Sequence, residues 1–189
     1  IPHGIFANVI KHLSLCVVFV ITCLPFFGQE KSTLHFLKAS DTLHKKRLIT
    51  VSVAQAAIWT GSLIALNNAW YANYPRSSFQ FFNDIKEWKQ VDKIGHAYSA
   101  YWGAQLSASL FRWSGVSRKK SALYGAGMGV AFESVIEILD GFSAGWGFSV
   151  GDMGANILGS ATFAAQELAW EEQRVQFKFS THKIHYPES

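Results

Sequence analysis

Charged side chains are scarce in this chain of 189 residues. Asp, Glu, Lys and Arg make up 16% of it, against about 25% in ordinary soluble domains. Apolar residues make up 49% and aromatic residues 15%, and many aromatic side chains stand near the ends of apolar segments. Trp and Tyr at such positions are typical of a membrane–water interface, although a small aromatic-rich helical bundle would also place them there. The composition therefore favours a membrane-associated protein over a soluble bundle.

Cysteine is almost absent, because Cys16 and Cys23 in the first apolar segment are the only two. If that segment is removed, the rest of the chain has no thiol and can form no disulfide. Residues 1–29 have the pattern of an export signal, with Lys11-His12 before the apolar run from Leu13 to Phe27. The run is short for a membrane-spanning helix. A cleaved signal peptide, a retained membrane anchor and a lipoprotein signal all remain open.

Sequence motifs of several functional classes are missing. The net charge is +4, but the basic residues are dispersed between apolar segments without a nucleic-acid-binding motif, so we expect no nucleic-acid partner. The glycines at 125, 127 and 129 follow no strand pattern and precede no Lys-Ser/Thr pair, which excludes a phosphate-binding loop. A Ser-His-Asp order, an activated cysteine and an HExxH motif are also absent, so nucleophilic catalysis and zinc-protease chemistry have little support.

The remaining chain predicts an all-α, membrane-associated antiparallel bundle of about four helices after the signal or anchor. Residues 30–47 form a basic polar linker, and residues 48–172 form the helical domain. Its first helix, from Leu48 to Tyr74, has no charged side chain and is long enough to span a bilayer. We expect an interfacial helix in the aromatic linker 76–91. In residues 173–189, Val175, Phe177 and Phe179 alternate with polar side chains, which indicates a strand-like tail. A lone strand lacks a partner, so the tail is expected to continue past the last residue.

Three further helices carry the ionisable residues, and we place them from about Asp92 to Trp113, Ser121 to Leu139 and Asp152 to Trp170. Spacings of three and four residues put small and polar side chains on one face of each helix. These faces consist of Asp92, His96, Ser99, Gly103 and Ser107; of Gly125, Gly129, Glu133, Glu137 and Asp140; and of Asp152, Asn156, Gly159 and Glu167. Small residues allow helices to approach closely, which is the usual packing device in membranes.

Antiparallel neighbours bring the start of the first of these helices, the end of the second and the start of the third to one level. Six polar residues are therefore expected to converge there: Asp92, His96, Glu137, Asp140, Asp152 and Asn156. Glu133 should lie about 6 Å deeper than Glu137. Loops 30–47 and 112–120 are basic and 141–151 has no basic residue, so the positive-inside rule puts the cluster on the extracytoplasmic side. A cleaved signal would instead export 30–47, and the sequence leaves this conflict open.

At these residues the chain resembles a known family. Asp92-Lys93-x-x-His96, Glu137-x-x-Asp140, and Gly145-Trp146-Gly147-Phe148-Ser149-x-x-Asp152 with Gly159 are similar to the YfiM-like family of uncharacterised bacterial lipoproteins, domain of unknown function 2279. Trp70-Tyr71, Phe81-Phe82-Asn83-Asp84, Trp88 and Gln166-Glu167-Leu168-Ala169-Trp170 resemble its longer, Bacteroidota-type branch. A more distant similarity links the motifs to VanZ-like membrane proteins associated with glycopeptide resistance. The resemblance implies a bacterial envelope protein and brings no established reaction.

The candidate catalytic residues are His96, Asp92, Glu137 and Asp152. His96 with Asp92 one turn earlier can form a proton-transfer pair, whereas the simpler alternative has Asp92 capping the helix and His96 hydrogen-bonded inside the bundle. With Ser149 before it, Asp152 also fits a helix cap, but capping does not explain Asn156 or two Glu residues in an apolar helix. Candidate ligand-binding residues are Lys93, Glu133, Asp140, Trp146, Ser149 and Asn156.

A divalent metal is a further alternative, with His96, Glu137, Asp140 and Asp152 as its ligands. The lack of a second histidine in the motif argues against it. Without a metal the clustered acids would repel one another, so at least one should have a raised pKa or pair with Lys93. The sequence specifies no cofactor.

These features predict a bacterial envelope membrane protein that binds or organises a lipid-linked or peptidoglycan-related ligand through the polar cluster. One alternative is a membrane hydrolase or transferase with His96 as base and Glu137 or Asp152 as partner. Another is a structural component of an envelope assembly. The expected partners are a membrane lipid or envelope glycolipid and other envelope proteins. The expected location is the membrane of the cell envelope, as a multi-pass protein or as an exported protein that faces the periplasm.

Overall fold

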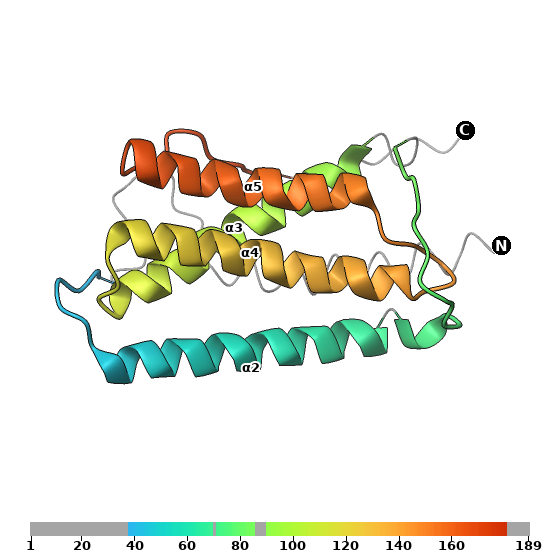
Figure 1. Ribbon diagram of the computed structural model, residues 1–189, viewed down its shortest axis with the longest axis horizontal. Helices are drawn as coiled ribbons and strands as arrows, with labels where there is room; N and C mark the ends of the chain where they lie inside the picture. The colour runs from blue at the N-terminus through green and yellow to red at the C-terminus, as the bar shows by residue number, and fades with distance from the viewer. Residues whose placement is uncertain (1–37, 70, 86–89, 181–189) are drawn as a thin grey trace, which may run out of the picture.

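The structure is a computed structural model that describes residues 38–180 except 70 and 86–89, so the expected signal or anchor at 1–29 lies outside the described part. Its elements are α2 (Lys45–Ala69), the short 3-10 helix η2 (Tyr71–Asn73), α3 (Val91–Trp113), α4 (Arg118–Gly141) and α5 (Val150–Ala169). In Figure 1, α2, α4 and α5 run side by side, and α3 crosses obliquely behind α4 and α5. The described residues contain no strand, which confirms the all-α fold class. The predicted helices differ from these mainly at their ends, where α4 and α5 begin earlier.

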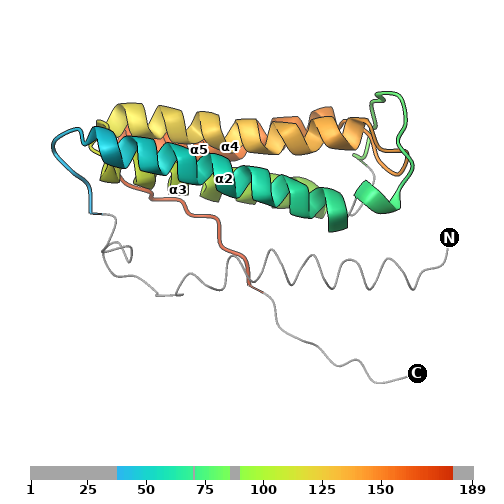
Figure 2. The ribbon, with the colours of Figure 1, turned by 90° about the horizontal axis from the view of Figure 1, so that it is seen from below.

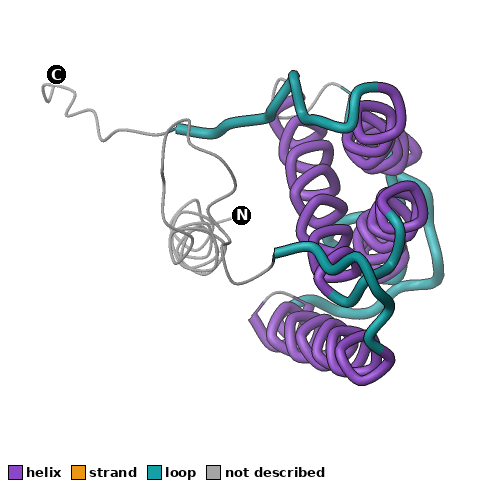
Figure 3. Tube along the Cα trace, turned by 90° about the vertical axis from the view of Figure 1, so that its left-hand side faces the viewer, coloured by secondary structure: helices purple, strands orange, loops and turns teal. Residues whose placement is uncertain are grey.

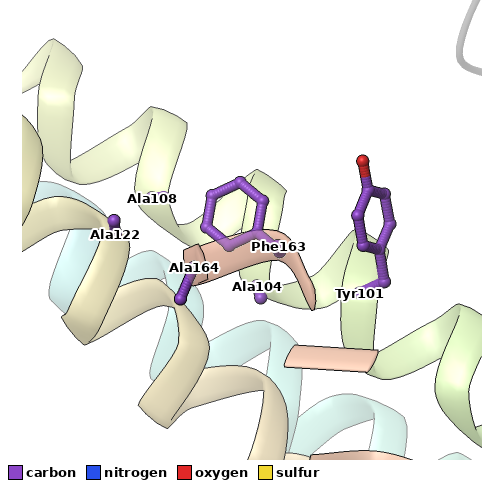
Figure 4. Packing of buried hydrophobic residues seen from close by; sticks show 6 residues of the cluster. All are labelled: Tyr101, Ala104, Ala108, Ala122, Phe163 and Ala164. Atoms are coloured by element: carbon purple, nitrogen blue, oxygen red, sulfur yellow. The ribbon is translucent and has the colours of Figure 1, made fainter. Parts of the chain in front are cut away.

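Helices α3, α4 and α5 form a core that is built from small side chains. The buried apolar cluster contains Tyr101 and Phe163, and its other members are Ala104, Ala108, Ala122 and Ala164 (Figure 4). A Cβ atom at Gly125 would overlap the backbone of α3 at Ala104, and one at Gly159 would overlap the carbonyl of Ala97. The glycines of α4 and α5 therefore pack directly against α3, as the small-residue stripes predict.

The stripe of α3 is rotated from the prediction. Ser107 is buried, but Ser99 is exposed, and the residues of α3 that face its neighbours are mostly alanines such as Ala97 and Ala100. The stripes of α4 and α5 are buried as expected at Gly125, Gly129, Glu133 and Glu137 and at Asp152, Asn156 and Gly159. Alanine is small enough to serve the same close approach as serine and glycine, so the polar pattern alone misplaced the contact face of α3.

Helix α2 lies along the outside of this core (Figures 1 and 2). Trp59 contacts Phe132 of α4 with ring centroids 5.2 Å apart, and the Arg47 guanidinium lies 4.7 Å from the centre of the Trp113 ring. An apolar groove of about 330 Å³ remains between α2 and α4, lined by Thr60, Leu63, Ile64, Asn67, Val135 and Leu139. By length and composition, the segment Lys45–Asn73 and α4 are apolar enough to cross a membrane. For α4 the same composition also suits a helix packed between α3 and α5.

The linker before α3 does not form the predicted interfacial helix over 76–85. It runs as an extended loop beside the α4–α5 loop, with isolated bridges between Arg76 and Ser143 and between Phe81 and Phe148. The backbone N–H of Gln80 donates to the carbonyl of Gly141, at 2.9 Å. Because the α4–α5 loop supplies these backbone partners, the linker needs no helical hydrogen bonds of its own. It closes the end of the bundle at which the polar residues lie.

The predicted strand-like tail is extended but pairs with no strand in the part of the chain that is described (Figure 3). Its backbone bonds to side chains of the bundle instead. The N–H of Val175 donates to Gln166 Oε1 at 2.6 Å, and the carbonyl of Phe177 accepts from Trp102 Nε1 at 2.9 Å. These side chains satisfy backbone groups that a neighbouring strand would otherwise satisfy, and they tie the tail to α3 and α5.

Candidate functional site

The predicted polar residues meet at one end of the core. Helix α3 begins there, α4 ends there and α5 begins there, so each helix contributes side chains from a terminal part of its length. Figure 1 shows these ends close to the linker that precedes α3. The antiparallel order of the three helices brings these ends to one level.

His96 is the centre of the cluster, and its side chain is 16% exposed. Its Nδ1 lies 3.1 Å from Asn156 Oδ1 and 3.6 Å from Glu133 Oε2. Its Nε2 lies 3.4 Å from Glu137 Oε1 and 3.9 Å from Asp92 Oδ1. One imidazole therefore contacts residues of α3, α4 and α5. Although Glu133 is one turn deeper than Glu137, both carboxylates reach the same ring.

Two polar atoms beside His96 have no hydrogen-bond partner among the described residues. They are Glu137 Oε1 and Asn156 Nδ2. The residues are 1% and 0% exposed, respectively. The other carboxylate oxygen of Glu137 accepts from the backbone N–H of Ser149 at 3.1 Å. An unsatisfied buried polar atom costs about 1–3 kcal/mol, so each of these two atoms is a place where a bound group could supply the missing partner.

Lys93 forms ion pairs with two acids at the edge of the cluster. Its Nζ lies 2.7 Å from Asp84 Oδ1 and 3.1 Å from Asp152 Oδ1. The hydroxyl of Ser149 donates to Asp84 at 3.0 Å and accepts from the backbone N–H of Asp152 at 3.1 Å. The linker, α3 and α5 are thus connected by one network, and Lys93 pairs with the acids as the sequence led us to expect.

The expected capping roles of the two helix-start aspartates are not found. Helix α5 is capped by the side chain of Ser149, and Asp152 supplies the N–H that this cap binds. At the start of α3 the capping position is Gln90, and no side chain caps the helix there. Asp92 instead stands 52% exposed beside His96. Helix capping therefore accounts for Ser149 but for neither aspartate side chain.

Asp140 and Trp146 lie beside the cluster and contact other groups. Asp140 Oδ1 accepts a hydrogen bond of 2.7 Å from the hydroxyl of Tyr71. The ring of Trp146 packs edge-on against Tyr71 and Tyr74, with centroids 6.2 Å and 4.3 Å apart. Asp84 and Tyr71 were not identified as site residues from the sequence. Both belong to the motifs that carry the family resemblance, and this could have indicated their part in the site.

The electrostatics of His96 are dominated by its neighbours. Burial by itself would lower its pKa, but the carboxylates of Glu133 and Glu137 outweigh burial and raise the pKa of His96 to about 9. The imidazole is therefore protonated at neutral pH in the protein alone. In that state it donates hydrogen bonds and cannot accept a proton.

Burial acts in the opposite direction on the neighbouring acids, because it raises the pKa of a carboxyl group. Burial raises the pKa of Glu137 to about 7, against the opposing effects of His96 and the Ser149 N–H. Burial and the neighbouring Asp84 raise the pKa of Asp152 to about 6. The pKa of Asp84 is lowered: burial opposes this, but hydrogen bonds with Asp152, Lys93 and Ser149 prevail. Burial thus makes Glu137 and Asp152 hold their protons more tightly, whereas hydrogen bonds favour the ionised form of Asp84.

Comparison with known proteins gives a family for this region. Residues 80–167 match the family described as "Predicted periplasmic lipoprotein (DUF2279)". This region belongs to the DUF2279 family. The match begins in the linker that carries Asp84 and ends at Glu167 in α5, so it contains His96 and its polar neighbours Asp92, Glu133, Glu137 and Asn156. It confirms the family resemblance without addressing the YfiM-like or Bacteroidota branches, and it indicates a location in the cell envelope. No curated protein and no solved structure matches the chain.

Proposed function

We propose that the protein binds a lipid-linked or peptidoglycan-related ligand in the bacterial envelope, with the cluster around His96 as its binding site. The observation that carries this proposal is the buried pair Glu137 Oε1 and Asn156 Nδ2, which lack partners in the described part of the chain. A hydroxyl or amide group of a glycan or peptide can donate to the acceptor and accept from the donor. A bound ligand would supply the hydrogen bonds that the folded chain leaves unmade.

We infer that a ligand approaches this pair from the side of Asp92, whose side chain is 52% exposed. The partly exposed Lys93 is beside it and offers a cationic group for a phosphate. Trp146 and Tyr74 form an aromatic pair at the same end of the bundle, and aromatic faces are suitable for stacking on sugar rings. These groups fit a ligand with polar and ring-shaped parts better than a small ion alone.

We also propose that α2 contacts a membrane. Four large apolar side chains of this helix are more than half exposed: Ile49, Val53, Ile58 and Ile64. Lipid would cover this surface, which water disfavours. Of the two expected arrangements, a multi-pass protein and an exported protein that faces the periplasm, the periplasmic description of the family supports the second.

Binding is better supported than the hydrolase or transferase alternative. A general base must be unprotonated, whereas the carboxylates around His96 raise its pKa to about 9. His96 is therefore suited to donate hydrogen bonds to a ligand. The third alternative, a structural component of an envelope assembly, would leave the unpaired groups of Glu137 and Asn156 without a role.

The test is retention of defined ligands by the full chain purified in mild detergent. A soluble muropeptide and a polyprenyl pyrophosphate are added separately, and binding is measured by native mass spectrometry. We expect the wild type to retain one of them and Glu137→Gln and Asn156→Ala to lose it while a cooperative melting transition shows that both variants remain folded. Glu167→Gln is the matched control, because Glu167 is a partly buried acid at the other end of the bundle. Equal retention by all variants, or by none including the wild type, would contradict the proposal.

A further inference from the structure

Three groups in the cluster are placed as the ligands of one cation would be. One ligand atom each from Asp92, His96 and Asp152 can be chosen so that all lie within 4.8 Å of one another. Protein ligands lie about 2.0–2.2 Å from a zinc ion, so atoms that share an ion are separated by about 3–4 Å. Binding an ion would therefore draw the three side chains closer together. The set differs from the one expected from the sequence, because Asp140 bonds to Tyr71 and Asp92 takes part instead.

Glu137 provides a second, independent observation. Its Oε1 is buried, has no hydrogen-bond partner among the described residues and lies 3.4 Å from His96 Nε2. A buried carboxylate oxygen without a donor is costly, and neither Ser149 nor Lys93 contacts it. A water or ligand hydroxyl held by a cation between His96 and Asp92 would supply the missing donor.

The contacts behind His96 fix the orientation that a metal requires. Nδ1 lies 3.1 Å from Asn156 Oδ1 and 3.6 Å from Glu133 Oε2, both of which are acceptors. A proton on Nδ1 is therefore stabilised, and Nε2 is directed at Asp92 and Glu137. Histidines that bind metals commonly donate their second ring N–H to an acceptor of this kind.

Carboxyl groups outnumber cationic groups in the cluster. Within the cluster, the carboxylates of Asp84, Asp92, Glu133, Glu137 and Asp152 outnumber the cationic groups of Lys93 and His96. Lys93 contacts Asp84 and Asp152 through a single oxygen of each. Glu133 and Glu137 have no lysine or arginine partner in the described part of the chain. A divalent ion would offset this excess of negative charge.

We propose that Asp92, His96 and Asp152 bind a divalent metal ion, and that Glu137 accepts a hydrogen bond from a group coordinated to it. One imidazole nitrogen with carboxylate oxygens suits zinc or manganese. The open positions of the ion face the exposed side of Asp92, where it would neutralise a phosphate of the ligand. The inference deepens the proposed function and rests on the same site.

The test uses the full chain, purified in mild detergent without a polyhistidine tag and stripped with EDTA. Zn²⁺ and Mn²⁺ are titrated separately by calorimetry, and Co²⁺ is titrated by visible absorption, which reports the ligand field directly. We expect one ion per chain and a loss of affinity of about ten-fold or more in Asp92→Asn. Asp92 is the first choice because it is half exposed and its replacement leaves the packed core unchanged. Glu172→Gln, an exposed acid beyond the far end of α5, should bind as the wild type does.

Asp152→Asn is the second variant, and its melting temperature shows whether the capped start of α5 is intact. The metal proposal is overturned if none of the three ions binds the wild type in a one-to-one ratio. It is also overturned if both aspartate variants bind as tightly as the wild type. Muropeptide and pyrophosphate binding, repeated in EDTA, separates the two proposals. Ligand retention without metal uptake would support the proposed function and contradict the metal site. Stoichiometric metal uptake without retention of either ligand would support the metal site and contradict the proposed function.

Discussion

Ser149 connects two helices at the scale of a single hydroxyl group. Its Oγ accepts from the N–H of Asp152 and donates to Asp84, and its backbone N–H donates to Glu137. The start of α5 is therefore fixed both to the linker and to α4. A serine that the sequence indicates as a helix cap also positions acids on two other segments.

We predict that Ser149→Ala lowers the free energy of unfolding by about 1 kcal/mol or more, since a helix cap and a second hydrogen bond are lost. Ser117 is the matched control, because it occupies the corresponding position before α4 but its side chain makes no cap hydrogen bond. Ser117→Ala should change stability by less than about 0.5 kcal/mol. Denaturant unfolding in mild detergent measures both. Equal effects of the two changes would show that capping is not the cause.

The carboxyl of Asp140 makes stability depend on pH. Burial raises its pKa to about 6 from an ordinary value of 3.8, although the hydroxyl of Tyr71 opposes this. The folded state thus binds this proton more tightly than the unfolded state. The resulting stabilisation is complete below the unfolded pKa and is lost as the pH rises through about 6.

We therefore predict that Asp140→Asn, which keeps an acceptor for Tyr71, stabilises the protein relative to the wild type as the pH rises. Between about pH 4 and pH 7 the difference in unfolding free energy should shift in favour of the variant by on the order of 1–3 kcal/mol. Unfolding curves at several pH values measure it. Asp41→Asn, an exposed aspartate near the other end of the bundle, is the control. A difference that does not vary with pH would refute this account of Asp140.

At the scale of the helices, contacts between small residues set the distances within the site. A side chain at Gly159 would overlap the carbonyl oxygen of Ala97, the residue next to His96. The approach of α5 to α3 at this point brings Asn156 within 3.1 Å of His96. Glycines that take no part in the chemistry therefore control whether the polar groups meet.

We predict that Gly159→Ala costs about 1–3 kcal/mol of stability, because the two helices must separate to admit the methyl group. It should also weaken ligand or metal binding at the His96 cluster. Gly154→Ala is the matched control in the same helix, since a Cβ there meets no atom within 4 Å. That change should be neutral or stabilising by up to about 1 kcal/mol, because alanine favours the helix. Thermal melts of both variants decide the matter; similar losses would exclude close packing as the cause.

For the whole molecule, the distribution of side-chain size is unlike that of most soluble domains. The buried core consists largely of alanine, glycine and serine, while Leu123, Ile157 and Leu158 are more than half exposed, as is much of α2. Soluble domains bury most of their leucine and isoleucine. This arrangement is typical of a protein whose outer surface meets lipid.

We predict that α2 contacts lipid directly. The fluorophore NBD is attached at Val53→Cys or Ile58→Cys in a chain whose two natural cysteines are replaced by serine. Its emission should shift to the blue and brighten when liposomes are added. The same label at Glu172→Cys, an exposed position beyond the end of α5, should not respond. Identical responses at all three positions would argue against a lipid-facing α2.

The sequence by itself determined the helical class, the approximate helix limits and the end of the bundle at which the acids gather. These depend on spacing along one helix and on the alternation of helix direction, and both can be seen in the order of residues. The tertiary structure alone decided which groups touch. Asp84 comes from a linker that was expected to be helical, and it bonds to Lys93. Asp140 accepts a hydrogen bond from Tyr71, and Asp92 does not cap α3. Such contacts depend on loop paths and side-chain rotamers, which local periodicity does not specify.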